Sequence, residues 1–185
     1  MRINQYTLGE LYESDLGLIR TWRNSKRVRA VMYSDAVISY DEHMNWYNRI
    51  KNSEETIVKV LYYLNKPIGF VNLTKIDKVN RTCYWGFYIG DERAPKGSGT
   101  IMGYLALEYI FETLAARKVC AEILGYNNVS ISYHKKLGFV EEGCLRKHVY
   151  KQGELTDVRL MAHFAEHWKL IKETLREGIR RYERR

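Results

Sequence analysis

The stretch "APKGSGTIMGYL", residues 94–105, places two glycines around a serine directly before an apolar segment. A glycine-rich turn at a helix start is typical of an anion site, because the first helical turn carries unpaired N–H groups and the positive end of the helix dipole. No Lys-Ser/Thr pair follows the glycines, which excludes a P-loop. The G-x-G-x-x-x-G spacing is one residue too long for a dinucleotide-binding turn. On these residues alone, a phosphate cradle and a plain tight turn both stay open.

The residues around this turn alternate between strand and helix patterns. Upstream, β-branched and aromatic runs over 56–64, 68–76 and 81–89 predict three antiparallel strands, and helical patterns over 14–22 and 39–50 precede them. Ser39 and Glu42 predict a capping box for the second of these helices. Downstream, the pattern predicts a helix over about 100–116, a strand over 118–124, a helix over 127–138 and a hairpin over 139–164 that turns at Gln152-Gly153. The order predicts a mixed α/β sandwich with a central sheet and a basic helical tail.

The composition predicts a soluble cytoplasmic protein of one domain, residues 1–185. Its 185 residues and 45% hydrophobic content suffice for a substantial core. The three cysteines are widely spaced, which argues against a disulfide framework or a zinc site. No stretch approaches the roughly 18 apolar residues of a membrane span. The net charge of +8 favours binding of phosphorylated cofactors and nucleotide-sugars as well as nucleic acid, so charge alone does not choose between them.

A second pattern, "AEILGYNNVSISYHKKLGF" over 121–139, follows the glycine turn. Together the two patterns resemble the GCN5-related N-acetyltransferase (GNAT) superfamily. The first family motif has the form Q/R-x-x-G-x-G/A, and Gly97-Ser98-Gly99 match it. The later helix motif is matched, with its usual spacing, by Asn127, Ser130, Lys136, Gly138 and Phe139. His134 stands where the family usually has a tyrosine.

This resemblance implies a mixed, mostly antiparallel sheet flanked by helices, and acetyl transfer from acetyl-CoA in a ternary complex without a metal. It implies an acetyl-CoA core over about 56–140, with a C-terminal hairpin and helix over about 139–185. Ala94 replaces the usual Arg or Gln, and Pro95 has no N–H to donate. The cofactor contacts are therefore expected from Phe87, Tyr88, Ile89, Lys96, Gly97, Ser98, Gly99, Thr100, Asn127 and Lys136.

Three residues are candidates for proton transfer. Glu122 lies in the C-terminal half of a predicted strand, where some family members carry the general base; a rim carboxylate is the alternative. His134 is the candidate acid for the departing thiolate, because an imidazolium can donate near neutral pH. Tyr133 is the reserve acid, with core packing as the alternative. His163 and His167 lack a third ligand and the H-E-x-x-H order, so we interpret them as structural.

The N-terminal helices, about 14–52, are expected to build the acceptor site. Contacts to the acceptor are expected from Arg23, Asn24, His43 and Trp46. The arginines of this region, which also include Arg27 and Arg29, offer guanidinium groups for phosphate, and Trp46 offers an aromatic face for a flat ring. The alternative is that Trp46 belongs to the core and the arginines to the solvated surface. Together with "APKGSG" and "HKKLGFVEEGCLRKH", this set resembles the acetyltransferases of pseudaminic acid biosynthesis. That resemblance implies UDP-4-amino-4,6-dideoxy-N-acetyl-β-L-altrosamine as acceptor, on a route to flagellin glycosylation.

Other acceptors stay open at this point. A ribosomal-protein N-terminal acetyltransferase is the nearest rival, because its C-terminal region has a similar run, here Gly143, Leu145, Arg146, Gly153, Asp157 and Trp168. A basic enzyme repels cationic polyamines unless acidic residues converge locally. A non-catalytic module that binds CoA or RNA ranks last, since no RNA-binding motif is evident. We expect a small-molecule nucleotide-sugar partner, no nucleic acid or membrane partner, and a monomer or homodimer.

Overall fold

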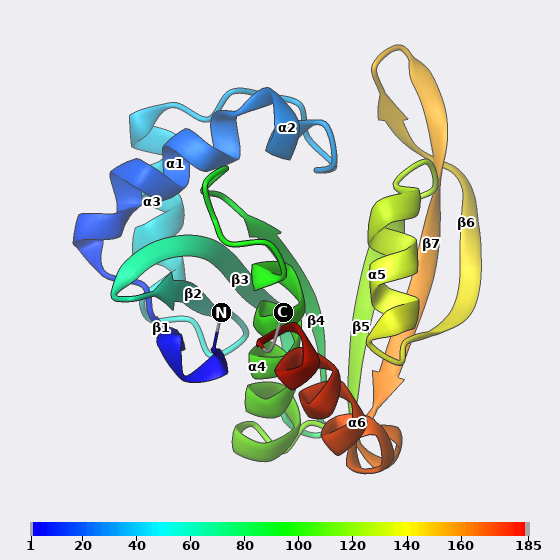
Figure 1. Ribbon diagram of the computed structural model, residues 1–185. Helices are drawn as coiled ribbons and strands as arrows, with labels where there is room; N and C mark the ends of the chain where they lie inside the picture. Colours follow the sequence, from blue (N-terminus) through cyan, green and yellow to red (C-terminus); the bar gives the residue numbers. More distant parts are fainter. Residues whose placement is uncertain (1, 184–185) are drawn as a thin grey trace.

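The computed structural model describes residues 2–183, which form a seven-stranded sheet flanked by helices (Figure 1). The strands follow the order β1-β2-β3-β4-β5-β7-β6. Their bounds are β1 (Tyr6–Glu10), β2 (Ile57–Tyr63), β3 (Lys66–Asp77), β4 (Thr82–Ile89), β5 (Lys118–Leu124), β6 (Val140–Lys151) and β7 (Glu154–Phe164). The helices are α1 (Leu16–Asn24), α2 (Lys26–Arg29), α3 (Tyr40–Ile50), α4 (Ser98–Glu108), α5 (Asn128–Lys136) and α6 (Ala165–Glu183).

Local sequence signals account for most of these elements. β2, β3 and β4 form the predicted antiparallel meander, and β6 and β7 form the predicted hairpin. The capping box is confirmed: the Ser39 hydroxyl accepts from the Glu42 amide, and the Glu42 carboxylate accepts from the Ser39 amide. Gln152 and Gly153 both have positive φ, as a two-residue hairpin turn requires. All of these signals act within a few residues, so the chain alone carries them.

Two elements differ from the predicted pattern. The prediction contained no strand before residue 14, yet β1 pairs antiparallel with β2. Only Tyr6 of β1 is buried, so the segment lacks the hydrophobic alternation that marks a strand, and its pairing partner decides its conformation. The helix predicted over about 100–116 ends at Glu108 and continues as a π-helical turn over Tyr109–Thr113.

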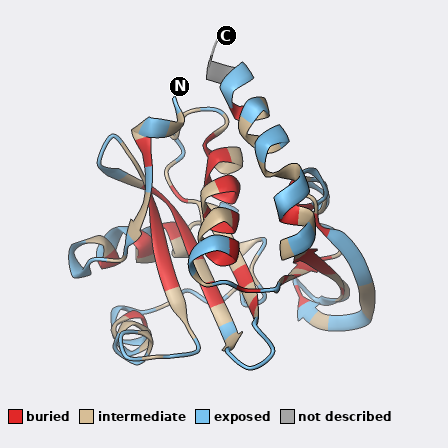
Figure 2. Cartoon of the chain, turned by 90° about the horizontal axis from the view of Figure 1, so that it is seen from below, coloured by how far each residue is buried: buried red, intermediate tan, exposed pale blue. Residues whose placement is uncertain are grey.

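The core lies between the sheet and α4, and Figure 2 shows the buried residues gathered on the central strands and on this helix. Ile101, Met102, Leu107 and Ile110 are each at most 1% exposed. Because the helix is apolar on nearly all sides, it is packed between the sheet and neighbouring elements, with α6 among its contacts. Within residues 2–183, none of the helices combines the length and hydropathy needed to cross a membrane.

The sheet opens between β4 and β5. These two strands run parallel, and their ladder within the described residues covers only Thr82–Tyr84 against Lys118–Cys120. On its other side β4 stays paired with β3 up to Ile89, and β5 stays paired with β7 up to Leu124. The two halves of the sheet therefore separate toward the C-terminal ends of β4 and β5 (Figure 1). In α/β sheets a ligand commonly binds at such a point.

Candidate active site

A groove of about 480 Å³ lies where β4 and β5 separate. Glu122 enters it from β5, His134 from α5 and Phe87 from β4. A second cavity of about 580 Å³ lies beside it, beneath α1 and α3. The two share Met32, Asn72, Gly86 and Phe87 in their linings, so a molecule in one is next to a molecule in the other. This arrangement suits a reaction between two substrates.

Glu122 is held from two sides. Its Oε2 accepts a hydrogen bond of 2.7 Å from the Tyr33 hydroxyl, and its Oε1 lies 3.6 Å from Lys75 Nζ. The Glu122 side chain is 25% exposed, so its carboxylate is fixed in direction but still reached by water. A carboxylate in this state is available to accept a proton from a molecule in the groove.

His134 does not fit the predicted role of an imidazolium acid. The ring is 3% exposed and packs against Trp85, Phe87 and Phe139. Burial lowers its pKa to about 4, because the apolar surroundings disfavour the charged form. Its Nδ1 lies 2.7 Å from the Ser130 carbonyl, which can only accept, so Nδ1 carries the proton and Nε2 carries the lone pair. At neutral pH this imidazole has no proton on Nε2 to give.

Tyr133 points away from the groove. Its hydroxyl donates to the Gly99 carbonyl at 2.5 Å, in the first turn of α4. Burial raises the pKa of this phenol, so it stays protonated. A Cβ on Gly103 would lie 2.3 Å from the Tyr133 oxygen, which shows how closely α5 and α4 approach. The hydroxyl thus ties the second family motif to the first.

The glycine turn forms the start of α4. Gly97 is the N-cap with φ of 97°, a conformation that favours glycine. The predicted donors run from Lys96 to Thr100, but the Ser98 amide donates to the Pro95 carbonyl and the Thr100 amide to the Gly97 carbonyl. Within the described chain, the amides of Lys96, Gly97 and Gly99 have no backbone acceptor, so these three are the donors the turn can offer.

Ser98 also differs from its predicted role. Its side chain is buried, and its hydroxyl donates to the Pro95 carbonyl at 2.6 Å and lies 3.0 Å from the Tyr6 hydroxyl. The side chain therefore holds the turn together and links it to β1. The strand that the sequence prediction missed thus supports the anion site.

The free side of β4 is the other feature that fits coenzyme A. Beyond Tyr84, this edge faces the opening and not β5, so its backbone can pair with an extended arm as an added strand would. Consecutive residues of a strand point their backbone groups to opposite sides. The Gly90 amide donates to Ile68 of β3, so Tyr88 also points its backbone to β3, whereas Phe87 and Ile89 point theirs to the free edge. The carbonyl of Ile89, a third predicted contact, already accepts from Arg27 Nη2 at 2.9 Å, as does Gly90 at 3.0 Å. The free backbone edge of β4 can pair with the pantetheine arm of coenzyme A, and the glycine turn at the start of α4 can bind the pyrophosphate that follows it.

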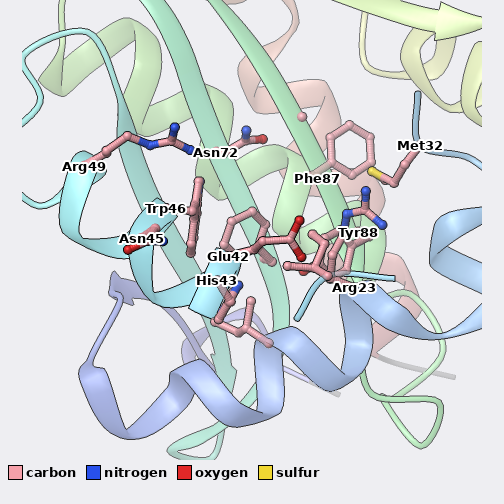
Figure 3. A pocket seen from close by; sticks show the side chains of 14 residues that line it. Arg23, Met32, Glu42, His43, Asn45, Trp46, Arg49, Asn72, Phe87 and Tyr88 are labelled. Carbon is pink, nitrogen blue, oxygen red and sulfur yellow. The ribbon is translucent and has the colours of Figure 1, made fainter. Parts of the chain in front are cut away.

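The second cavity contains three of the four residues predicted for the acceptor (Figure 3). Arg23 and Arg49 lie toward opposite ends of it, with Trp46 and Glu42 between them. The His43 ring stacks on Trp46 with centroids 5.0 Å apart. Among the described residues, His43 Nε2 and Arg23 Nη1 are buried polar atoms without a hydrogen-bond partner.

Asn24, the fourth predicted acceptor residue, does not line the cavity. Its Nδ2 donates to the Ile38 carbonyl and its Oδ1 accepts from the Ile38 amide, both at 2.8 Å. Asn127 does line the groove, but its side-chain oxygen caps α5 by accepting from the Ser130 amide at 3.1 Å. Both asparagine side chains therefore hold nearby backbone segments in place, at Ile38 and at the start of α5. Lys136 lies apart from both cavities, beside Thr100 in a further hollow next to α6.

Several residues of the site were not predicted. Tyr33 and Lys75 hold the proposed base, and Met32 lines both cavities. Asn72 carried a recognisable signal, since it interrupts an apolar strand; its Oδ1 would lie 2.7 Å from a Cβ on the facing Gly86. The other three come from segments whose sequence gives no indication of what they contact.

The comparisons with known proteins match this geometry. A family model described as "Acetyltransferase (GNAT) domain" matches residues 6–140. The chain belongs to this family. Spermidine N(1)-acetyltransferase of Vibrio cholerae is 28% identical over 159 residues, which cover 85% of this chain and 92% of the relative. The Bacillus subtilis protein YokL, an uncharacterized N-acetyltransferase derived from the SPbeta prophage, is 34% identical over 95 residues, or 50% of this chain and 52% of the relative.

A solved structure gives the same result. The crystal structure of spermidine N-acetyltransferase from Vibrio cholerae, in complex with CoA and spermine, superposes with a TM-score of 0.83 at 26% identity. The match covers 88% of this chain and 97% of that one. The predicted GNAT fold and the prediction of an N-acetyltransferase that uses acetyl-CoA are confirmed. The acceptor, the residue roles and the monomer or homodimer stay predictions; another structure of the Vibrio cholerae enzyme is described as dodecameric.

Proposed function

We propose that this GNAT protein acetylates the amine of a nucleotide-linked amino-sugar, with UDP-4-amino-4,6-dideoxy-N-acetyl-β-L-altrosamine of pseudaminic acid biosynthesis as the acceptor. The observation that carries the proposal is the lining of the larger cavity. The guanidinium groups of Arg23 and Arg49 lie toward opposite ends of this cavity with the aromatic face of Trp46 between them, and the cavity adjoins the groove that holds Glu122. Guanidinium groups bind phosphates and an aromatic face binds a nucleobase.

The charge balance of the site supports this acceptor. The larger cavity contains two arginines and one carboxylate, Glu42, whose oxygen already accepts from the Ser39 amide. The groove adds Lys75 and Glu122, which lie against one another. The whole chain carries +8. A diphosphate with one sugar amine gains from this field, whereas a polyamine with several positive charges is repelled by it.

The chain is assigned one proton transfer and the binding of both substrates. The acceptor amine must be neutral before its nitrogen attacks the thioester carbonyl, so Glu122 takes one proton, directly or through water. The C–N bond forms and the C–S bond breaks; the attacking nitrogen loses its second proton, and the departing sulfur takes one up. His134 is neutral and Tyr133 is bonded to Gly99, so neither is placed as that donor by its hydrogen bonds. The free backbone edge at Phe87 holds the donor, and the α4 turn holds its pyrophosphate.

Spermidine is the second candidate acceptor. It is supported by relatives named as spermidine acetyltransferases, one of which aligns over 85% of this chain. The carboxylates of Glu42 and Glu122 would have to meet the cationic amines, in a site that also contains Arg23 and Arg49.

An assay of thiol release from acetyl-CoA identifies the acceptor. The protein is incubated with acetyl-CoA and, in parallel, with UDP-4-amino-sugars, spermidine and N-terminal peptides of ribosomal proteins. Thiol release confined to UDP-4-amino-sugars is the expected result. Release only with spermidine or only with peptides rules the nucleotide-sugar out. Acetyl-CoA binding without release for any amine, together with RNA affinity that falls steeply with salt, would indicate a non-catalytic module.

A further inference from the structure

The segment between α2 and α3, residues 30–38, reaches across the opening to the half of the sheet formed by β5, β6 and β7 and then returns to α3. We call this segment the strap. Met32 of the strap lines both cavities, and Tyr33 donates the 2.7 Å hydrogen bond to Glu122. In Figure 1 the loop after α2 reaches toward the hairpin of β6 and β7. The strap therefore forms part of the acceptor wall and also contacts the proposed base.

A single buried cation holds the strap to the hairpin. Lys151, the last residue of β6, has a side chain that is 1% exposed. Its ammonium donates to the Arg29 carbonyl at 2.8 Å, to the Met32 carbonyl at 2.5 Å and to the Asp35 carboxylate. An ammonium has three N–H donors, and each has an acceptor here. A lysine is almost never this buried unless it is paired, so the cluster is specific in both composition and geometry.

Weaker ties fix the rest of the strap. From the same half of the molecule as Lys151, the Tyr126 hydroxyl donates to the Ala30 carbonyl at 2.6 Å. From the other half, Arg29 Nη1 donates to the Asp35 carbonyl at 2.7 Å, and Asn24 bonds both backbone groups of Ile38. The strap is thus attached to both halves of the opened sheet. Among these contacts, only the Lys151 cluster involves a fully buried charge.

We propose that Lys151 is a positioning residue for the acceptor: it holds the strap so that Met32 closes the cavity and Tyr33 orients Glu122. The inference rests on the proposed function only in that it concerns the acceptor side of the site. Lys151 touches neither of the two cavities itself. Its loss frees the strap, and both the acceptor wall and the direction of the carboxylate loosen together, whereas the α4 turn and the free edge of β4 are untouched.

The test is the Lys151→Met variant of the full chain, which keeps the volume and removes the ammonium. We expect the KM for the acceptor to rise about tenfold, because hydrogen bonds to a charged group are among the strong ones. The KM for acetyl-CoA should stay within about twofold, because the α4 turn and the free edge of β4 lie outside the strap, although Met32 and Tyr33 also line the groove. The matched control is Lys147→Met, which removes a positive charge from an exposed position on the same strand and should behave as the wild type.

A second readout needs no acceptor. Trypsin cleaves after Arg29, whose carbonyl accepts from Lys151, and we expect cleavage at this bond in native protein to speed up about tenfold in Lys151→Met. This rate is measured by mass spectrometry, so it tests the strap even if no nucleotide-sugar is acetylated. KM is measured with whichever amine of the panel is a substrate, which separates a failure of this inference from a failure of the proposed function.

The outcomes that overturn the inference are specific. An unchanged acceptor KM together with an unchanged cleavage rate shows that Lys151 does not position the strap. An equal rise in both KM values shows a general structural role. If Lys151→Met does not fold, Asp35→Asn decides: Asp35 is 43% exposed in its side chain, so the fold tolerates the change. A higher acceptor KM in Asp35→Asn supports the inference, and wild-type values refute it.

Discussion

The buried imidazole of His134 makes the stability of this protein depend on pH. Its pKa falls from an ordinary value of 6.5 to about 4 on folding, because the ring is enclosed by Trp85, Phe87 and Phe139. The unfolded chain therefore binds a proton more readily than the native one between these two values. The contribution of the neutral His134 ring to the free energy of unfolding is fully present above about pH 6.5 and is lost as the pH falls toward 4.

The size of the effect follows from the same two values. Each pKa unit corresponds to about 1.4 kcal/mol, so lowering the pKa from 6.5 to about 4 removes about 3 kcal/mol of stability below pH 4. At pH 5, where the unfolded ring is almost wholly protonated and the native ring is not, the loss is about 2 kcal/mol. Against a typical unfolding free energy of roughly 5–15 kcal/mol, this is readily measured.

Two assays check the prediction. The chemical shifts of the His134 ring, followed by NMR from pH 7.5 downward, should show a midpoint near 4. Urea unfolding at pH 7.5 and pH 5 should show a loss in the wild type that is about 2 kcal/mol larger than in His134→Asn, whose amide can still donate to Ser130. Burial also lowers the pKa of His163 to about 4. This residue is present in both proteins, so its effect on stability cancels in the comparison.

A ring midpoint at or above pH 6 would refute the reasoning, and so would equal losses in the two proteins. Either result would restore His134 as a candidate imidazolium acid. A low midpoint also means that any limb of the kcat profile near pH 6 belongs to another group.

Three further predictions concern individual side chains. Glu122→Gln should lower kcat by about 10²-fold with little change in either KM, whereas the same change at exposed Glu141 should leave kcat unaltered; equal effects would remove Glu122 as the base. Trp46→Leu should raise the acceptor KM up to about tenfold and spare that for acetyl-CoA, and a shift in both would contradict its place in the acceptor cavity. Gly103→Ala should cost about 1–3 kcal/mol in denaturant unfolding, because its Cβ would meet the Tyr133 oxygen at 2.3 Å. Its control, Gly17→Ala, has nothing within 4 Å and should be neutral or stabilising.

The order of the elements could be predicted because each signal is local. Ser39 and Glu42 cap a helix, Gln152-Gly153 turns a hairpin, and Gly138 with φ of 92° ends α5. Residues 6–10 could not be assigned in this way, since four of the five are not buried and the strand exists through its pairing with β2.

In the candidate site too, the features that depend on local sequence could be predicted, and those that depend on distant contacts could not. The glycine turn and the 127–139 helix could be found because their backbone requirements restrict residue type at fixed spacing. The roles within them were harder to predict. His134 fits its motif position, yet burial makes it neutral. The side chains of Ser98 and Asn127 hydrogen-bond nearby backbone groups, the carbonyl of Pro95 and the amide of Ser130.

By itself, the sequence determined the family pattern, the helix that carries the anion turn, and the residue types available for acetyl transfer, because capping, turn and periodicity signals act over a few residues. Only the tertiary structure decided that Lys151 reaches the strap 116 to 119 positions earlier and that Tyr33 meets Glu122. It also decided which predicted side chains face a cavity. Protonation and contact depend on burial, and burial is set by segments that are far apart in the chain.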